Sequence, residues 1–489
     1  MNIIAFDLGG SGGKLFLGQY DEGKLKLTTV HRFTHSATEL NGNLYWDLLR
    51  IYQELCEGIK EAVRLTDDDI EALGIDTYCN DFALVSPEGE LVTQMHSYRD
   101  SRTIRKREQI YHIMSPDELY AVNGNQNAPF NTLMQIGAMV LSQQCYLLEN
   151  NKLLFLPDLL IYFLSGKMFH EYTLASVSQM FDYAKKDWCG KILESYGIPD
   201  TLFSEIVYPG TINCQTSDET NKRLNTKGFP IVTVCEHDTA SAFLASVYEE
   251  ACAIISCGTW ALIGTETKEP IITEYGFRYN IANEGGFDGH HRILKNVMGT
   301  WLIQELCADL RSRGEEYSYA QLEKESKKAE AFAYLIDVDD ELFYTPGNMI
   351  KKLQDKCKSY YGKQPETPGE FARCIYESLV LKYRWCLEKL HHLTGIEFRY
   401  VNLLGGGAQS GLMCQFTANA TGLAVAAGPV EATALGNMIV QLAALKKIAS
   451  IEEGRRIIRN SFDIREYRPE MTTEWDKQYN EFKEIFHLE

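Results

Sequence analysis

The sequence predicts an α/β protein built from two domains of similar topology. The chain has 489 residues, which at roughly 100–200 residues per domain is enough for two or three domains with sizeable cores. Short apolar runs alternate along it with segments whose apolar residues recur every three or four positions, the patterns of strands and amphipathic helices. A strand–turn–strand pattern at the N-terminus also recurs after residue 250, and such a distant repeat predicts a second domain like the first.

The first thirty residues carry the clearest local pattern. Residues 2–8 are apolar, residues 9–13 form a glycine-rich turn, residues 14–19 are again mostly apolar, and a tight turn leads to alternation over residues 24–30. This order predicts an antiparallel meander. A Rossmann fingerprint or a P-loop needs a helix after the glycines, and the spacing to Lys14 is also one residue short of a Walker A motif. The remaining readings are a glycine hairpin that surrounds phosphate with backbone N–H groups and a plain β-turn.

Further elements follow from the same patterns. Helices are expected over residues 46–63, from about 97–102 onward, and over 240–248, 297–310, 311–330, 368–393, 411–421 and 432–445; strands are expected over 72–77, 82–85, 229–235, 251–256, 260–264 and 400–404. The repeat places the domain boundary near residues 246–251, which gives predicted domains over 1–248 and 249–489, with a cleft between them.

Composition excludes several classes of function. With 48 Lys and Arg against 67 Asp and Glu, the formal net charge is −19, which argues against general nucleic-acid binding and against docking on anionic membranes. We expect no targeting or membrane-spanning segment and a cytoplasmic protein. The 13 cysteines include no C-x-x-C pair, and no Cys/His cluster has zinc spacing, so free thiols and no zinc site are expected.

Two carboxylates stand out as candidates for chemistry. Asp238 follows a predicted strand and opens a predicted helix, so it either caps that helix or acts as the general base that takes a proton from a substrate hydroxyl. Asp7 ends the first strand before the glycine turn, where it either holds Mg²⁺, mostly through water, or bonds its own backbone as a turn residue. His237 and Thr239 could hydrogen-bond the same substrate as Asp238.

Weaker signals accompany them. Lys14 could contact phosphate or lie along the strand edge, and Gly405–Gly407 before a helix could bring the backbone close to a flat or anionic ligand or form a crowded turn. Asn296 and Gln304 could face one cleft only loosely. Each signal alone is weak, but their order along the chain is specific.

That order resembles the FGGY family of carbohydrate kinases over nearly the whole chain. The matching segments are Phe6-Asp7-Leu8-Gly9-Gly10-Ser11, Tyr45-Trp46-Asp47, Gly74-Ile75-Asp76-Thr77, Asp81-Phe82, YRDSRT from Tyr98, HDTASA from His237, Gly258-Thr259-Trp260, NVMGTWL from Asn296, GGGAQ from Gly405 and AGPVEATALGN from Ala427. The YRDSRT and AGPVEATALGN segments resemble the branch of the family that phosphorylates L-rhamnulose.

The resemblance implies two actin-like (ribonuclease H-like) domains flanking a catalytic cleft, and transfer of the γ-phosphoryl group of ATP, with Mg²⁺, to a ketose hydroxyl. By position in the family's motifs, Asp238 is the implied proton acceptor and Asp7 the implied metal-binding residue. The implied sugar contacts are Asn80, Asp81, His237, Thr239 and Asn296, and the implied ATP contacts are Gly10, Ser11, Gly12, Gly13, Lys14, Thr259, Gln304 and Gly406. The implied partners are the ketose and ATP alone, with a monomer or homodimer expected.

Two departures from the family pattern bear on specificity. Gly12 stands where the family usually has Ser, and Tyr78-Cys79-Asn80-Asp81 stands where it has Trp-Gly-x-Asp. The second departure alters the sugar pocket and concerns the identity of the sugar more than the reaction. L-rhamnulose is the expected substrate; L-fuculose, L-xylulose and L-ribulose are alternatives within the class. An actin- or chaperone-like ATPase and a catalytically silent sugar sensor are rivals outside it.

Overall fold

The computed structural model describes residues 1–248 and 250–489, so the start of the predicted second domain, at residue 249, lies outside the described residues. The chain divides into two compact units. Unit 1 comprises residues 1–245, 266–293 and 432–461, and unit 2 comprises residues 246–265, 294–431 and 462–489. Each compact unit is therefore built from three separate stretches of the chain. The domain boundaries at 1–248 and 249–489 stay a prediction.

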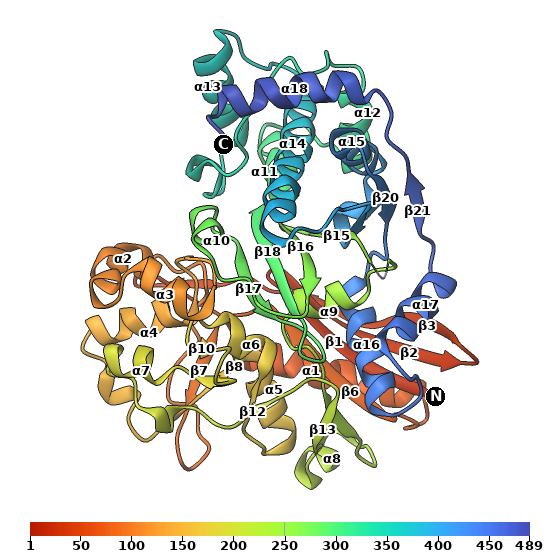
Figure 1. The fold of residues 1–489 in the computed structure, drawn as a ribbon. Coiled ribbons are helices and arrows are strands. Elements are labelled where there is room, and N and C mark those ends of the chain that lie inside the picture. Colours follow the sequence, from red (N-terminus) through yellow and green to blue (C-terminus); the bar gives the residue numbers. More distant parts are fainter. Residues whose placement is uncertain (249) are drawn as a thin grey trace. The chain divides into compact units, whose positions relative to one another are not determined.

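Unit 1 contains the N-terminal elements and two C-terminal helices (Figure 1). Its strands are β1 (Asn2–Gly9), β2 (Gly12–Asp21), β3 (Lys24–Thr34), β4 (Thr38–Leu40), β5 (Asn43–Tyr45), β6 (Ala72–Thr77), β7 (Phe82–Val85), β8 (Lys152–Phe155), β9 (His170–Glu171), β10 (Phe181–Asp182), β11 (Asp187–Trp188), β12 (Ile206–Val207), β13 (Thr211–Gln215), β14 (Pro230–Thr233) and β17 (Ala282–Gly285). Its helices are α1 (Leu48–Leu65), α2 (Arg102–Ile113), α3 (Pro116–Asn123), α4 (Thr132–Leu141), α5 (Leu156–Ser165), α6 (Tyr172–Val177), α7 (Gly190–Tyr196), α8 (Asp218–Leu224), α9 (Asp238–Leu244), α10 (Glu274–Arg278), α16 (Ala432–Ala444) and α17 (Ile451–Ser461), with short 3₁₀ turns at Cys145–Leu147 and Asp200–Leu202.

The central sheet of unit 1 has the strand order β13-β14-β6-β1-β2-β3. The pairs β1–β2 and β2–β3 are antiparallel, which confirms the predicted meander, whereas β6 runs parallel to both β1 and β14. Ile4, Phe6 and Leu8 of β1 share one buried apolar cluster with α1 and α5. Because side chains alternate along a strand, Asp7 faces the opposite side, the side that α16 covers.

Unit 2 is centred on strands β16, β15, β19, β20 and β21, in this order. Its elements are β15 (Cys252–Cys257), α11 (Trp301–Ser312), α12 (Tyr319–Ser326), α13 (Met349–Tyr361), α14 (Pro368–Thr394), β19 (Tyr400–Leu404), α15 (Gly411–Thr421), β20 (Ala424–Ala427), β21 (Arg465–Tyr467) and α18 (Thr472–Ile485), with 3₁₀ turns at Glu341–Phe343 and Gly406–Gln409. The strands β16 (Trp260–Thr267) and β18 (His291–Met298) carry the chain from one unit to the other.

The structure confirms most of the predicted elements and corrects two. The helix predicted from residue 297 begins at Trp301, because residues 296–298 still belong to β18 and Gly299 turns the chain. The single helix predicted over residues 311–330 was also wrong. The chain bends at Gly314, whose φ is +84°, and a new helix starts after Ser318, which forms a capping box with Gln321.

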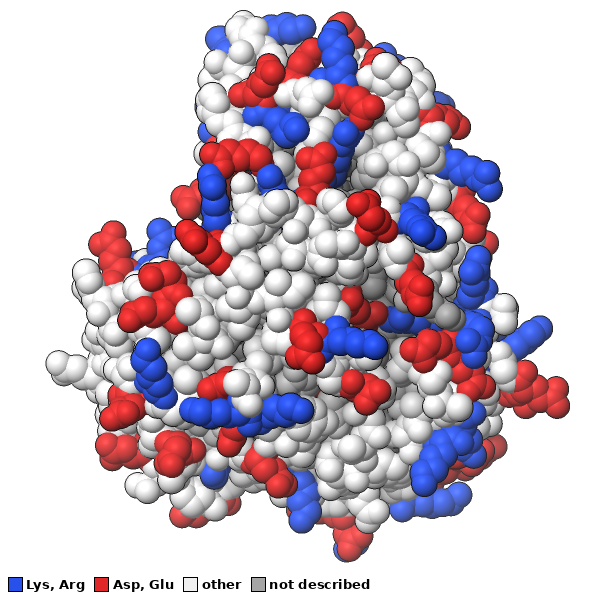
Figure 2. All heavy atoms as spheres, viewed as in Figure 1, with Lys and Arg blue, Asp and Glu red and all other residues white. Residues whose placement is uncertain are grey.

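Two surface features complete the description. In the part of the chain that the structure describes, no helix is both long enough and apolar enough to cross a membrane. Figure 2 shows acidic and basic side chains interspersed over the face that it draws, without a gathering of basic residues there.

Candidate active site

The carboxyl ends of three parallel strands bring the predicted residues of unit 1 together. β1 and β6 pair so that Asp7 lies beside Asp76. After β14, His237 forms an isolated parallel bridge with Thr77, and the amide of Tyr78 donates to the carbonyl of Leu8 at 3.1 Å. In parallel sheets, this edge is where ligands are usually bound. The structure therefore places the Asp7 end of the glycine hairpin, the Tyr78–Asp81 segment and His237–Asp238 at one edge of the sheet.

Asp238 is the first residue of α9, and its carboxylate does not cap that helix. His237 occupies the N-cap position without a side-chain cap bond, while Asp238 Oδ1 accepts from the amide of Thr239 at 2.6 Å and from its hydroxyl at 3.1 Å. The side chain of Asp238 remains 28% exposed. Desolvation of the carboxylate raises the pKa of Asp238 to about 6, although the hydrogen bonds from Thr239 act in the opposite direction and lower it. The carboxylate is thus accessible, ionised at neutral pH and basic enough to take part in proton transfer.

His237 is held in one tautomer by a buried arginine. Arg292 Nη2 donates to His237 Nδ1 at 3.1 Å, so the proton of the neutral ring is on Nε2. That nitrogen lies 3.5 Å from Asp238 Oδ1. Burial, together with the charge of Arg292, keeps the pKa of His237 well below its ordinary value. The histidine therefore stays neutral and directs an N–H toward the candidate base.

Arg292 itself is almost fully buried, at 1% exposure, and is neutralised by Glu284. Its Nη2 lies 3.0 Å from Glu284 Oε2, and its Nε donates to the carbonyl of Gly285 at 2.9 Å. A buried charge needs such a partner. Neither Arg292 nor Glu284 was predicted from the sequence, because neither stands in a recognisable motif. The one signal that could have suggested them is a pair of opposite charges on two strands, β17 and β18.

A second network surrounds Asp81, which follows Asn80 at the entrance to β7. Asp81 accepts hydrogen bonds from Trp46 Nε1 at 2.6 Å, from the amide of Tyr98 at 3.0 Å and from Gln135 Nε2 at 2.9 Å. Burial nonetheless raises the pKa of Asp81 to about 7. Both carboxylate oxygens of Asp81 thus accept hydrogen bonds from protein groups. This geometry is that of a residue that orients the side chains around it.

Asn80 is the neighbour that Asp81 and its partners hold in place. It adopts a left-handed backbone conformation, with φ +78°, and its carbonyl accepts from Thr132 Oγ1 and Gln135 Nε2. Asn80 Nδ2 contacts the sulfur of Cys79 at 3.1 Å. Burial and the nearby carboxylates of Glu284 and Asp238 raise the pKa of that thiol. The residue that replaces the family's glycine therefore lies at the same site as Asp238.

The glycine hairpin between β1 and β2 offers amide groups to an anion. Among the described residues, the amides of Gly10 and Ser11 donate no hydrogen bond, which suits the cradling of phosphate oxygens. A Cβ on Gly12 would lie 2.6 Å from the carbonyl of Phe33, so a side chain at this position would require β3 to shift. Lys14 lies opposite Asp7 in the β1–β2 register, which places both predicted residues beside the hairpin.

Asp7 and Asp76 make the edge of this sheet acidic. Asp76 is buried, and Asn437 Nδ2 of α16 donates to its Oδ2 at 2.5 Å. Burial, and the charge of Asp7, raise the pKa of Asp76 well above its ordinary value. Within the described residues, no group of three His, Cys, Asp or Glu side chains could hold a metal ion. A divalent ion here would be coordinated mainly by its nucleotide and water, with Asp7 as the candidate protein ligand.

The predicted nucleotide residues of unit 2 also meet at the ends of adjacent parallel strands. β15 and β19 pair in parallel up to Ser256 and Leu404, so the loops that begin at Gly258 and Gly405 lie side by side. Gly405 has φ +76° and ψ −160°, a conformation that essentially only glycine adopts. These loops carry Thr259 and Gly406, two of the residues predicted to contact ATP.

Gln304 is linked to the loop at Gly258 by hydrogen bonds that run through Thr300. Thr300 Oγ1 donates to the carbonyl of Gly258 at 2.7 Å, and Gln304 Nε2 donates to Thr300 Oγ1 at 3.1 Å. Asn296 is in unit 2 as well, on β18, with a buried Oδ1 that has no hydrogen-bond partner among the described residues. Its predicted contact with the sugar stays a prediction.

Comparison with known proteins identifies the family. The model of the N-terminal domain of the FGGY family of carbohydrate kinases matches residues 2–245, and the model of its C-terminal domain matches residues 253–445. The chain belongs to the FGGY family of carbohydrate kinases. The predicted family and the predicted class of enzyme, a carbohydrate kinase, are confirmed.

Relatives of full length agree with this. A rhamnulokinase of Bacteroides thetaiotaomicron is 36% identical over 99% of both chains, and one of Bacillus subtilis is 35% identical over 96% of both. A xylulose kinase of Lactobacillus acidophilus has a similar structure, with a TM-score of 0.84 at 16% identity over 99% of this chain and 98% of that one. A glycerol kinase of Plasmodium falciparum has a TM-score of 0.76 at 15% identity over 99% and 97%. These structures confirm the two-domain α/β fold.

Proposed function

We propose that the protein is an ATP-dependent kinase that converts L-rhamnulose to L-rhamnulose 1-phosphate. The observation that carries this proposal is the similarity to rhamnulokinases at 35–37% identity, which extends over nearly the whole chain. Asp238, accessible and with a pKa raised to about 6, supports the phosphoryl-transfer chemistry. The enzyme would act in the cytoplasm on a small ketose.

Asp238 would accept the proton of the ketose hydroxyl that attacks ATP. An ionised carboxylate suits this role because it orients the hydroxyl and removes its proton as the new P–O bond forms. His237 and Thr239 would hydrogen-bond the sugar beside it, and Asn80 would contact the sugar from the Asp81 network. Asn296 is a further proposed sugar contact. In this arrangement Asp81 acts through Asn80.

The nucleotide would be held by backbone groups more than by side chains. The amides of Gly10 and Ser11 donate no hydrogen bond to the described residues, and with Gly12, Gly13 and Lys14 they would bind the phosphates. Thr259, Gln304 and Gly406 would bind the rest of the nucleotide. Mg²⁺, when bound with ATP, would neutralise charge on the phosphates. Asp7 would approach that ion through water, since the described residues offer no cluster of three ligands.

A panel of sugars tests the substrate. ADP release would be measured with ATP and Mg²⁺ against L-rhamnulose, L-fuculose, L-xylulose, L-ribulose and glycerol, and the phosphorylated carbon would be assigned by ³¹P–¹H NMR. We expect the highest kcat/KM for L-rhamnulose, with phosphate on C1. A higher kcat/KM for another ketose would refute L-rhamnulose as the substrate while leaving the kinase assignment intact.

A further inference from the structure

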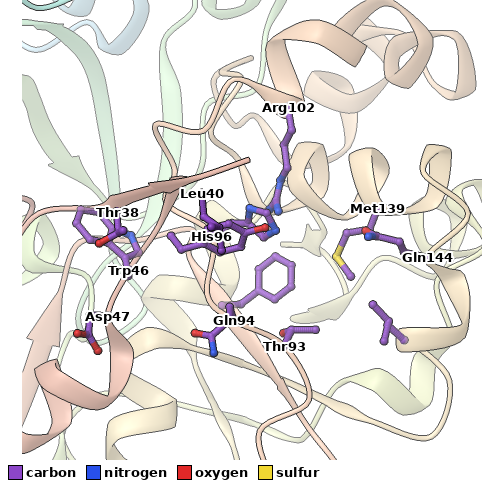
Figure 3. A pocket seen from close by; sticks show the side chains of 13 residues that line it. Thr38, Leu40, Trp46, Asp47, Thr93, Gln94, His96, Arg102, Met139 and Gln144 are labelled. Carbon is purple, nitrogen blue, oxygen red and sulfur yellow. The ribbon is translucent and has the colours of Figure 1, made fainter. Parts of the chain in front are cut away.

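A cavity in unit 1 lies beside the network around Asp81. Its volume is about 480 Å³, within the range of small-molecule binding sites. It is bounded by the β4–β5 hairpin, by the segment Thr93–His96, by the start of α2 and by the end of α4 (Figure 3). Its lining contains none of the residues predicted to contact ketose or ATP. We call it the Arg102 cavity.

Arg102 is a partly buried cation whose hydrogen-bonding capacity is only partly used. Its Nη2 donates to Gln135 Oε1 at 2.8 Å, while its Nε is buried without a partner and its Nη1 makes no hydrogen bond to any described residue. Burial lowers the pKa of Arg102 to about 10, in spite of the carboxylates of Asp100 and Asp81. An incompletely paired guanidinium in a cavity wall favours an anion, because charge and donors are satisfied together.

The acidic groups near Arg102 are already engaged. Asp100 Oδ1 accepts from the amide of Arg102 at 2.7 Å, and its Oδ2 accepts from the amide of Leu44 at 2.5 Å. Asp47, the acidic residue of the lining, is exposed and accepts from the amide of Arg50 at the start of α1. Figure 3 shows Asp47 at the opposite edge of the labelled group from Arg102, which points toward His96 and Leu40.

The rest of the lining suits an organic molecule better than a bare inorganic ion. The rings of Tyr45 and His96 lie 4.3 Å apart with a tilt of 39°, and Trp46 adds a third flat surface. Burial lowers the pKa of His96 to about 4, so the ring is neutral at pH 7 and able to hydrogen-bond a polar body. Gln94 and Gln144 contribute amides. Rings and amides around a single cation match a polyol that carries one anionic group.

We propose that the Arg102 cavity binds a small organic anion, a sugar-sized carboxylate or phosphate monoester, with the anionic group on Arg102 and the polar body against Tyr45, His96 and Trp46. The site is prearranged, because the bond to Gln135 fixes the guanidinium before any ligand arrives. Two of its walls, Trp46 and Arg102, also hold the network around Asp81.

Isothermal titration calorimetry on the full chain tests the proposal. The probes are D-gluconate, which carries a carboxylate, glycerol 3-phosphate, which carries a phosphate monoester, and xylitol, which is an uncharged polyol. We expect at least one of the two anions to bind at millimolar concentration or below, and xylitol to bind at least tenfold more weakly; the tighter anion identifies the head group. Failure of both anions to bind at 10 mM, or equal binding of xylitol, would overturn the proposal.

Variants locate the binding. Arg102→Met is expected to weaken the anion at least tenfold, whereas Arg107→Met, an exposed change on the same helix, should leave the affinity unchanged. Leu40→Trp provides a second test should Arg102→Met fail to fold, because Leu40 is 60% exposed at the cavity wall and a larger side chain there obstructs the cavity without removing a hydrogen bond. Anion binding that persists unchanged in Leu40→Trp and in any folded Arg102→Met would place the site elsewhere and refute the assignment.

Discussion

Replacing Arg292 with methionine tests how the buried guanidinium tunes the candidate base. Arg292 Nη2 is 3.1 Å from His237 Nδ1, and His237 Nε2 is 3.5 Å from Asp238 Oδ1. Across the imidazole ring, the guanidinium and the carboxylate are therefore at most about 9 Å apart, and at an effective dielectric constant of about 20 their attraction is about 2 kcal/mol. At about 1.36 kcal/mol per pKa unit, loss of this attraction raises the pKa of Asp238 by about 1.4 units.

The expected result is a change in the pH profile. Asp238 must be ionised to accept a proton, so kcat/KM of the native enzyme falls as the pH drops through about 6. In Arg292→Met this acid limb moves from about 6 to between about 7 and 7.5, while Arg292→Lys, which keeps the charge, leaves it near its native position. Removing Arg292 also leaves Glu284 buried without its cation, which costs about 3–5 kcal/mol of folding stability.

The assay is ADP release at saturating ATP and varied ketose between pH 5 and 9, with thermal melts and circular dichroism to confirm that each variant is folded. A purely structural role for Arg292 would lower the melting temperature but leave the acid limb in place. A folded Arg292→Met enzyme whose acid limb coincides with the native one would therefore refute the electrostatic reasoning.

Three further predictions concern single side chains. In Gly436→Ala, the new Cβ would lie 1.7 Å from the carbonyl of Ser241, so α16 and α9 must separate; we expect a loss of about 3 kcal/mol or more in urea unfolding, and unchanged stability would contradict this packing. Asp81→Leu leaves three donors, from Trp46, Tyr98 and Gln135, without an acceptor. We therefore expect the KM for the ketose to rise at least tenfold in steady-state assays while the KM for ATP stays the same. An equal rise in both KM values would argue against a role at the sugar. Cys79→Gly restores the family's residue beside Asn80, and the ratio of kcat/KM between L-rhamnulose and L-xylulose should change at least threefold; an unchanged ratio would exclude position 79 from specificity.

Much of the framework was predictable because local patterns determine it. The meander over residues 2–30 consists of short apolar or alternating runs separated by glycine-containing turns, and strands 72–77, 82–85 and 400–404 are short apolar runs between turn residues, which leave few alternatives. The family resemblance then placed Asp238 and the glycine loops in order. Where the pattern was ambiguous, as at residues 297–298, the end of a strand was taken for the start of a helix, because its apolar residues also fit a helical spacing.

The charged residues behind the site were not predictable from local pattern. Arg292 and Glu284 are ordinary charged residues in the sequence, and only the fold brings them to His237. Asp76 and Asn437 are 361 positions apart, although each stands in a segment that matches the family. Such partners depend on which strands pair and which helix covers them, information that is not contained in any short stretch of sequence.

The most direct test of the central claim compares the native enzyme with Asp238→Asn. ADP release is measured with ATP and Mg²⁺, with and without L-rhamnulose, and melting curves verify that the variant is folded. The account predicts sugar-dependent ADP release in the native enzyme and a loss of at least a hundredfold in kcat in the variant, in line with the removal of a general base. Equal rates with and without sugar, or a folded Asp238→Asn enzyme with native kcat, would contradict it.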